Sequence, residues 1–435
     1  MSNKKSLFIR DGVNYAVPFA AISALFFLWG VAHGLLDALD KNFQEMLHLK
    51  KWQSSLIQFH LYGAYAAMAI PAGLFMKKYG YKKGVIFGLI LFATGALLAA
   101  VTAPVQSFVL FLFCLLIIGC GLATLETAAN PYTTKLGPPE TAERRINFSQ
   151  SFNGLAWTVG PLIAIYIYGN RSHVEGEKMM SIVLPFALIG LAVLVVALIF
   201  KRLKLPEITE EDENAAHGIH NDSATTATGE AMDVSDPSDS RYITKKPLWQ
   251  NRHFKLGVIA QACYVGAQTG VFSYLINFLT DDKDMHMEPR FKVADGPYFL
   301  SIGFALFMIG RISGSALMKY FKPAKLLAFY SLAVCLLLPV VGAEIGWPSV
   351  IALYGVFFFM SIMFPTIFAL AIKGLGPQTK RGAAFLVMSV AGGAIFPLLM
   401  GAISDTYGMA VGFFVPIPLF LFILYYATNG YKVKA

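Results

Sequence analysis

The sequence of 435 residues is poor in charged groups. Asp, Glu, Lys and Arg together make up 14% of it. Soluble domains carry roughly 25% charged residues. So small a supply of charge argues against a soluble globular chain.

Cysteine is scarce as well, and the motifs of metal and nucleotide chemistry are missing. The four cysteines all lie in apolar stretches without metal-ligand spacing, which predicts free, inert thiols. The sequence holds no phosphate-binding P-loop, no metalloprotease His-Glu pattern and no nucleophile motif in a plausible context. We therefore expect no metal, no cofactor, no enzyme activity and no ATP-driven pump.

The sequence is rich in apolar residues. They make up 56% of the chain, and the mean hydropathy is +0.58. Crossing a ~30 Å hydrocarbon core takes about 20 residues of helix, and the sequence predicts twelve such segments. Strands of a barrel would alternate apolar and polar residues, which these segments do not. The expected spans are 14–40, 54–76, 84–102, 107–134, 147–169, 180–200, 253–280, 296–318, 325–342, 347–373, 382–404 and 409–428.

The basic residues indicate the orientation of these segments. Alternate loops hold 26 and 8 Lys and Arg residues, and one further cation, Arg311, lies inside a segment. Because basic loops stay on the cytoplasmic side, both termini are predicted to be cytoplasmic. The net charge of +9 is then mostly topological, and we expect no nucleic-acid partner.

A polar linker divides the chain into two halves of six segments. Between Leu205 and Ser240 there are ten acidic residues and no basic ones, a composition that predicts a flexible loop. We expect one bundle in residues 1–200, a linker in 201–250 and a second bundle in 251–435. An internal repeat supports this division: Gly73 with Lys78-Tyr79 recurs as Gly314 with Lys319-Tyr320, and Leu136-Gly137-Pro138 as Leu375-Gly376-Pro377. Parallel repeats of this kind place a substrate near the membrane midplane, between the halves.

Ionisable residues inside the segments are the strongest functional candidates, since a charge at a helix centre costs about 2.5–3.5 kcal/mol on insertion scales. Asp37 lies one helical turn after His33, and Glu126 one turn before Asn130. A carboxyl group in an apolar interior can hold a proton, which a proton-coupling site requires. The alternative is a carboxylate paired permanently with Arg or Lys. Arg311, near the basic end of its segment, is expected to be structural.

Amides form a second group of candidates. Amide groups both donate and accept hydrogen bonds, which suits sugar hydroxyls, but they also join membrane helices to one another at about 0.6 kcal/mol each. For the group as a whole we favour substrate contact. Its members are Gln150 and Asn153 in the fifth segment, and Gln261, Gln268 and Asn277 in the seventh, where Tyr264 shares one helix face with Gln261 and Gln268.

Four stretches resemble one known family. They are Phe26-Phe27-Leu28-Trp29, the run Leu125-Glu126-Thr127-Ala128-Ala129-Asn130-Pro131, the run Cys263-Tyr264-Val265-Gly266-Ala267-Gln268-Thr269, and Pro365-Thr366-Ile367-Phe368. They resemble the fucose–proton symporters of the major facilitator superfamily, and the resemblance extends over all twelve segments. It implies a twelve-helix, alternating-access fold in which Asp37 and Glu126 are the cavity carboxylates.

The resemblance also extends to a basic loop. Gly73, Lys77 and Lys78 match the superfamily's loop between helices 2 and 3, although Lys77 stands where that loop usually carries Asp. Two cavity positions depart from the fucose pattern: His33-Gly34 replaces a pair of Asn residues, and Phe364 replaces a Tyr.

We therefore expect a monosaccharide importer of the bacterial inner membrane that works as a monomer in symport with protons. L-Fucose is the first candidate substrate, and galactose or glucose come next. The alternatives are an exporter or a proton-coupled carrier of another small polar solute. A membrane-embedded enzyme or a non-transporting sensor is the remote alternative.

Overall fold

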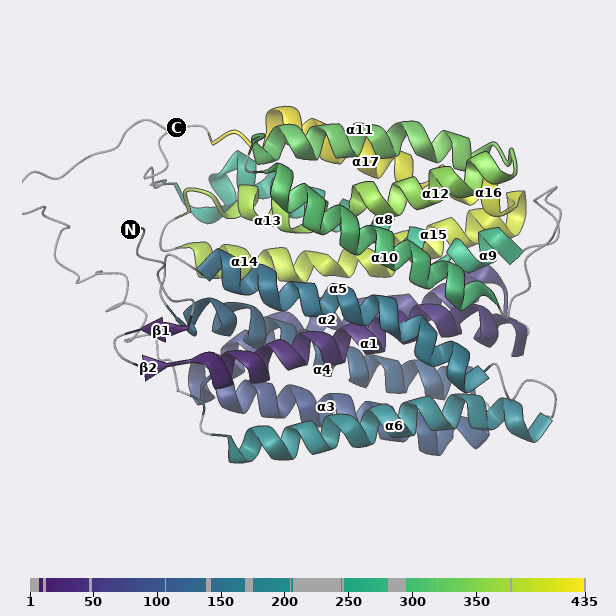
Figure 1. Ribbon diagram of the computed structural model, residues 1–435, viewed down its shortest axis with the longest axis horizontal. Helices are drawn as coiled ribbons and strands as arrows, with labels where there is room; N and C mark the ends of the chain where they lie inside the picture. Colours follow the sequence, from purple (N-terminus) through teal and green to yellow (C-terminus); the bar gives the residue numbers. More distant parts are fainter. Residues whose placement is uncertain are drawn as a thin grey trace, which may run out of the picture.

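The protein is a bundle of long helices that run roughly along one axis (Figure 1). A computed structural model describes residues 8–10, 13–46, 49–105, 107–137, 142–168, 175–203, 205, 244, 246–280, 295–318, 320–375 and 378–433. A short antiparallel hairpin, β1 Ile9–Arg10 and β2 Val13–Asn14, precedes the first helix. The all-helical prediction is confirmed for the described residues, in which every element other than β1 and β2 is a helix.

The described part of the N-terminal half holds six spans, each a single unbroken helix. They match the first six predicted segments, with ends shifted by several residues. Their bounds are α1 Ala16–Met46, α2 Lys51–Tyr79, α3 Tyr81–Thr102, α4 Phe108–Lys135, α5 Ala142–Tyr168 and α6 Glu175–Arg202, with the short turn η1 Ala103–Val105 after α3.

The C-terminal half also shows six spans among its described residues, but four of them are interrupted. The breaks separate α8 from α9, α12 from α13, α14 from α15 and α16 from α17. The bounds are α8 Arg252–Ser273, α9 Leu275–Thr280, α10 Gly296–Leu317, α11 Pro323–Gly342, α12 Trp347–Met360, α13 Met363–Ile372, α14 Thr379–Met388, α15 Gly392–Tyr407, α16 Met409–Gly412 and α17 Pro416–Tyr425, with the 3-10 helices η3 Leu248–Gln250 and η6 Ser389–Ala391 and the π-helix η7 Tyr426–Gly430.

Ten of the described helical segments are long and apolar enough to cross a membrane. The remaining two predicted spans, α5 and α8 with α9, are less apolar. They are the spans that carry most of the predicted amides, Gln150 and Asn153 in α5 and Gln261 and Gln268 in α8. Their polarity is thus concentrated where the sequence places the candidate site.

The two halves meet along two helix pairs, α2 with α15 and α5 with α10. The hairpin of β1 and β2 lies at one end of the bundle, to the left in Figure 1, whereas α9 and α16 lie at the other. We call the end that holds Met46, Lys51, Thr280 and Tyr407 the distal end. Most of the linker predicted at 201–250 lies outside the described residues.

Candidate functional site

Glu126, in the middle of α4, belongs to a chain of polar side chains. Its carboxylate accepts hydrogen bonds from the Tyr65 hydroxyl of α2 and the amide of Asn130. The Asn130 Oδ1 atom accepts one from Gln150 Nε2 of α5, at 3.4 Å. Three of the predicted residues, Glu126, Asn130 and Gln150, are therefore brought together by the fold.

Asp37 lies where the two halves touch. Its side chain is only 6% exposed. The Oδ1 atom accepts a hydrogen bond from Gln58 Nε2 of α2, at 2.8 Å, and one from Ser273 Oγ of α8, at 3.4 Å. Because α8 belongs to the C-terminal half, this carboxylate takes part directly in contact between the halves.

An aromatic stack covers the turn before Asp37. The His33 ring stacks on Trp157 of α5, with ring centroids 5.6 Å apart and planes 20° apart, and lies 5.8 Å from the Tyr62 ring. Trp157 in turn meets Phe272 of α8 edge-on, at 5.4 Å. The indole Nε1 of Trp157 is buried and makes no hydrogen bond within the described part of the chain. The stack therefore presents one spare donor.

The predicted amides do not form one cluster. Asn153 donates to the Phe26 carbonyl, at 3.1 Å, and so ties α5 to α1. Asn277 donates to Gln44 Oε1, at 2.8 Å, near the distal end. Gln261 is fully buried, and its amide N and O have no hydrogen-bond partner among the described residues, whereas Gln268 is half-buried.

Tyr264 and Arg311 gather at the break between α12 and α13. The Tyr264 hydroxyl donates to the Met360 carbonyl at 2.9 Å, and Arg311 Nε donates to the Ser361 carbonyl at 3.2 Å. Pro365 has no N–H, so the Ser361 carbonyl lacks its usual helical donor. Arg311 also lies 4.9 Å from the centre of the Phe307 ring. These contacts fit the structural role expected of Arg311.

The basic loop follows α2. Lys78 lies over the Tyr79 ring, 5.2 Å from its centre, and Gly80, with φ 87°, separates α2 from α3. A Cβ atom added to Gly73 would meet nothing within 4 Å. The Lys77 side chain lies outside the described part of the structure.

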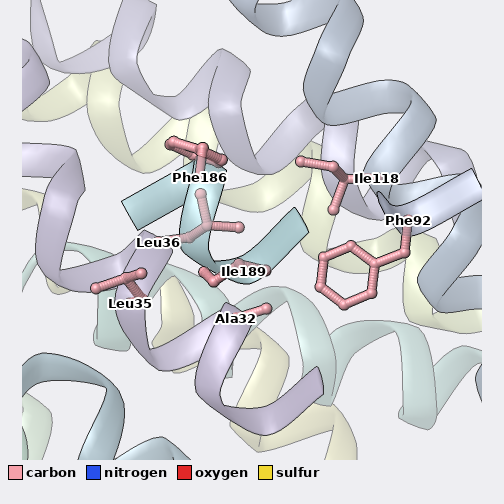
Figure 2. A pocket seen from close by; sticks show the side chains of 7 residues that line it. All are labelled: Ala32, Leu35, Leu36, Phe92, Ile118, Phe186 and Ile189. Atoms are coloured by element: carbon pink, nitrogen blue, oxygen red, sulfur yellow. The ribbon is translucent and has the colours of Figure 1, made fainter. Parts of the chain in front are cut away.

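A small crevice lies inside the N-terminal half, between α1, α3, α4 and α6 (Figure 2). Only carbon side chains line it, so it offers no hydrogen bond to a polar solute. Its lining residues are Ala32, Leu35, Leu36, Phe92, Ile118, Phe186 and Ile189. No group of three or more potential metal ligands occurs among the described residues.

Several residues of the site were missed at the level of sequence: Gln58, Tyr65, Trp157 and Ser273. Gln58, Tyr62 and Tyr65 follow one another at helical spacing and lie on one face of α2. That face was a usable signal. Trp157 and Ser273 carried none, because single aromatic and hydroxyl residues are common in membrane helices.

Comparison with known proteins agrees with this architecture. Residues 19–393 match the family model of the Major Facilitator Superfamily. The chain is 36% identical to the L-fucose-proton symporter of Escherichia coli K12, over 91% of this chain and 88% of that one. It is 35% identical to the glucose/galactose transporter of Brucella abortus (strain 9-941), over 96% and 95% of the two chains.

A solved structure shows the same fold. The crystal structure of a Major Facilitator Superfamily transporter, FucP, in the outward conformation aligns with a TM-score of 0.70 and 34% identity, covering 97% of this chain and 100% of that one. The chain belongs to the Major Facilitator Superfamily, and within it to the family of the fucose–proton symporters and glucose/galactose transporters.

Proposed function

We propose that the protein imports a monosaccharide together with protons by alternating access. The observation that carries the proposal is that two carboxyl groups, Asp37 and Glu126, lie in membrane spans, and that Glu126 is held by the uncharged donors Tyr65 and Asn130. Among the described residues no lysine or arginine is seen paired with Glu126. A carboxyl group without a fixed cation can change its protonation during a cycle, which supports a coupling role and disfavours the permanent ion pair.

The two carboxyl groups have different roles in this proposal. Glu126 takes up the proton, since its donors, Tyr65 and Asn130, can tolerate either protonation state. Asp37 links substrate binding to movement of the halves, because it bonds to Ser273 across their interface. A solute bound beside Asp37 would therefore change the contact on which closure depends.

The sugar is proposed to bind between the halves. His33, Asp37, Asn130 and Gln150 offer donors and acceptors for hydroxyl groups, and the spare Trp157 N–H offers one more. The curated relatives are named as L-fucose or glucose/galactose transporters, so these three sugars are the candidates. No sugar contact is assigned, in the conformation of this structure, to the other predicted residues Gln261, Tyr264, Gln268 and Asn277.

The setting of the protein is part of the same proposal. The excess of Lys and Arg in one set of loops supports cytoplasmic termini in a bacterial inner membrane, with a monomer as the working unit and no enzyme activity. The division into bundles 1–200 and 251–435, joined by the acidic segment 201–250, completes the proposal.

Uptake of labelled L-fucose, D-galactose and D-glucose into proteoliposomes tests it, with and without an inward proton gradient. We expect uphill accumulation of one sugar that a protonophore abolishes. Failure of all three sugars to accumulate, in protein shown to be folded, would overturn the sugar assignment. A counterflow assay with unlabelled small polar solutes would then identify a different cargo, and efflux driven by the opposite gradient would identify an exporter.

A further inference from the structure

The first two backbone N–H groups of α2 are bound by a carboxylate from the other half. The first four N–H groups of any helix lack an intrahelical acceptor. Here Asp405, near the end of α15, accepts from Lys51 N at 3.0 Å with Oδ1 and from Trp52 N at 2.9 Å with Oδ2. The residue before α2 is Lys50, whose side chain has no acceptor. Gln53 of α2 accepts from the Lys50 N–H, at 2.8 Å, so the C-terminal half supplies the part of the cap that binds Lys51 and Trp52.

This contact is also favourable electrostatically. The N-terminus of a helix carries a partial positive charge, and a carboxylate there is stabilised. Asp405 is exposed, so water can replace the two N–H donors when the helices separate. A hydrogen bond to a solvent-exposed carboxylate can therefore form and break repeatedly.

Other hydrogen bonds between the halves surround Asp405 at the distal end. Tyr274 donates to the Lys51 carbonyl at 3.0 Å, and Ser55 donates to the Pro397 carbonyl at 3.0 Å. Farther toward the middle of the bundle, the contact between Asp37 and Ser273 continues the same line. The distal end is therefore closed by a row of bonds that joins α1 and α2 to α8 and α15.

The helices approach so closely there that Gly401 of α15 has no room for a side chain. A Cβ atom added to Gly401 would first meet the Tyr274 hydroxyl, and it would lie 2.9 Å from Ser55 Oγ and 3.0 Å from the Lys51 carbonyl carbon of α2. A contact at 3.0 Å is tighter than nine in ten of those that real Cβ atoms make. The Asp405 bonds thus depend on full contact between α2 and α15.

We infer that Asp405 is the latch that holds the distal end closed, and that it must release α2 each time the protein opens on that side. The inference rests on the proposed alternating-access cycle. Removing the carboxylate shifts the balance of states toward the one open at the distal end, by about tenfold for a contribution of about 1.4 kcal/mol.

Distance measurements between spin labels test the latch without any transport assay. Val105 and Ile345 lie at the distal end, one in each half, and are 64% and 61% exposed. Both would be replaced by labelled cysteines in a chain whose four native cysteines are replaced by serine. In lipid nanodiscs, Asp405→Ala should raise the ratio of long to short distances about tenfold, and Asp405→Asn should raise it less.

Asp295→Asn is the matched control. Asp295 is an exposed acidic residue at the same end, and its side chain caps no helix. It should leave the distances unchanged. A second variant, Gly401→Val, should favour the long distance by preventing the approach of α2 and α15. Distances that stay the same in Asp405→Ala would overturn the latch. Because sugar uptake is measured separately, that result would leave the proposed substrate untouched.

Discussion

Each span of the N-terminal half is one unbroken helix, whereas four spans of the C-terminal half are interrupted. The unbroken half contains both membrane carboxyl groups, Asp37 and Glu126. The interrupted half contains Arg311, and its carbonyls at the break after Met360 accept bonds from side chains. Irregular backbone is tolerated at membrane depth only where such partners satisfy it. One half therefore holds both membrane carboxyl groups on a regular frame, and the other holds interrupted helices whose carbonyls are satisfied by side chains.

The largest effect on transport is expected from the carboxyl groups of the unbroken half. Glu126→Gln should abolish uphill uptake, because the side chain can no longer gain and lose a proton. One proton moving down 100 mV supplies about 2.3 kcal/mol, which supports a ratio of internal to external sugar of about fifty. In Glu126→Gln this ratio should fall to about one, because the proton gradient no longer drives uptake. The measurement is sugar accumulation in proteoliposomes with an imposed gradient.

Exchange provides the control for that variant. Sugar-for-sugar counterflow needs no net proton movement and should persist in Glu126→Gln, whereas Glu126→Asp should keep some uphill uptake. Full accumulation by Glu126→Gln would assign the proton to another residue, with Asp37 as the next candidate.

The close packing of the unbroken half should appear in a glycine substitution. A Cβ atom on Gly160 of α5 would lie 2.7 Å from the Gly34 carbonyl carbon and 2.7 Å from Leu35 N, both backbone atoms of α1. Gly160→Ala should therefore destabilise the protein by about 1–3 kcal/mol. Gly63→Ala, whose Cβ meets nothing within 4 Å, should be neutral or slightly stabilising. Apparent melting temperatures in detergent would compare the two, and equal values would contradict the close contact between α1 and α5.

The interrupted half can be tested at its break. Tyr264→Phe removes the donor to the Met360 carbonyl and should cost about 1–2 kcal/mol, since a carbonyl between two helix segments is left unpaired. Asn153→Ala removes a bond to the Phe26 carbonyl, which lies inside unbroken α1, and should cost only about 0.6 kcal/mol. A loss of melting temperature that is larger for Asn153→Ala would reverse the proposed difference between the halves.

Much of the architecture could be predicted from sequence, because a membrane fixes the length and polarity of each span. Neighbours within one helix were predictable too: His33 with Asp37, and Glu126 with Asn130, are each one turn apart. Contacts between the halves were not. The contacts of Ser273 with Asp37 and of Asp405 with α2 depend on how the two halves are placed in the transport cycle. Residue spacing along the chain carries no information about that placement.

The smallest expected effect concerns Gln261, whose buried amide N and O find no partner in the described structure. Gln261→Leu has a similar shape and removes two unpaired polar atoms, so we expect stability to rise by about 1 kcal/mol. The sugar concentration that gives half-maximal uptake should stay the same, because the residue is fully buried in this state. A melting temperature that rises with unchanged uptake would place Gln261 in the packing of the C-terminal half. A large loss of uptake would instead show that another state of the cycle exposes it to the sugar, as its position among the predicted amides first suggested.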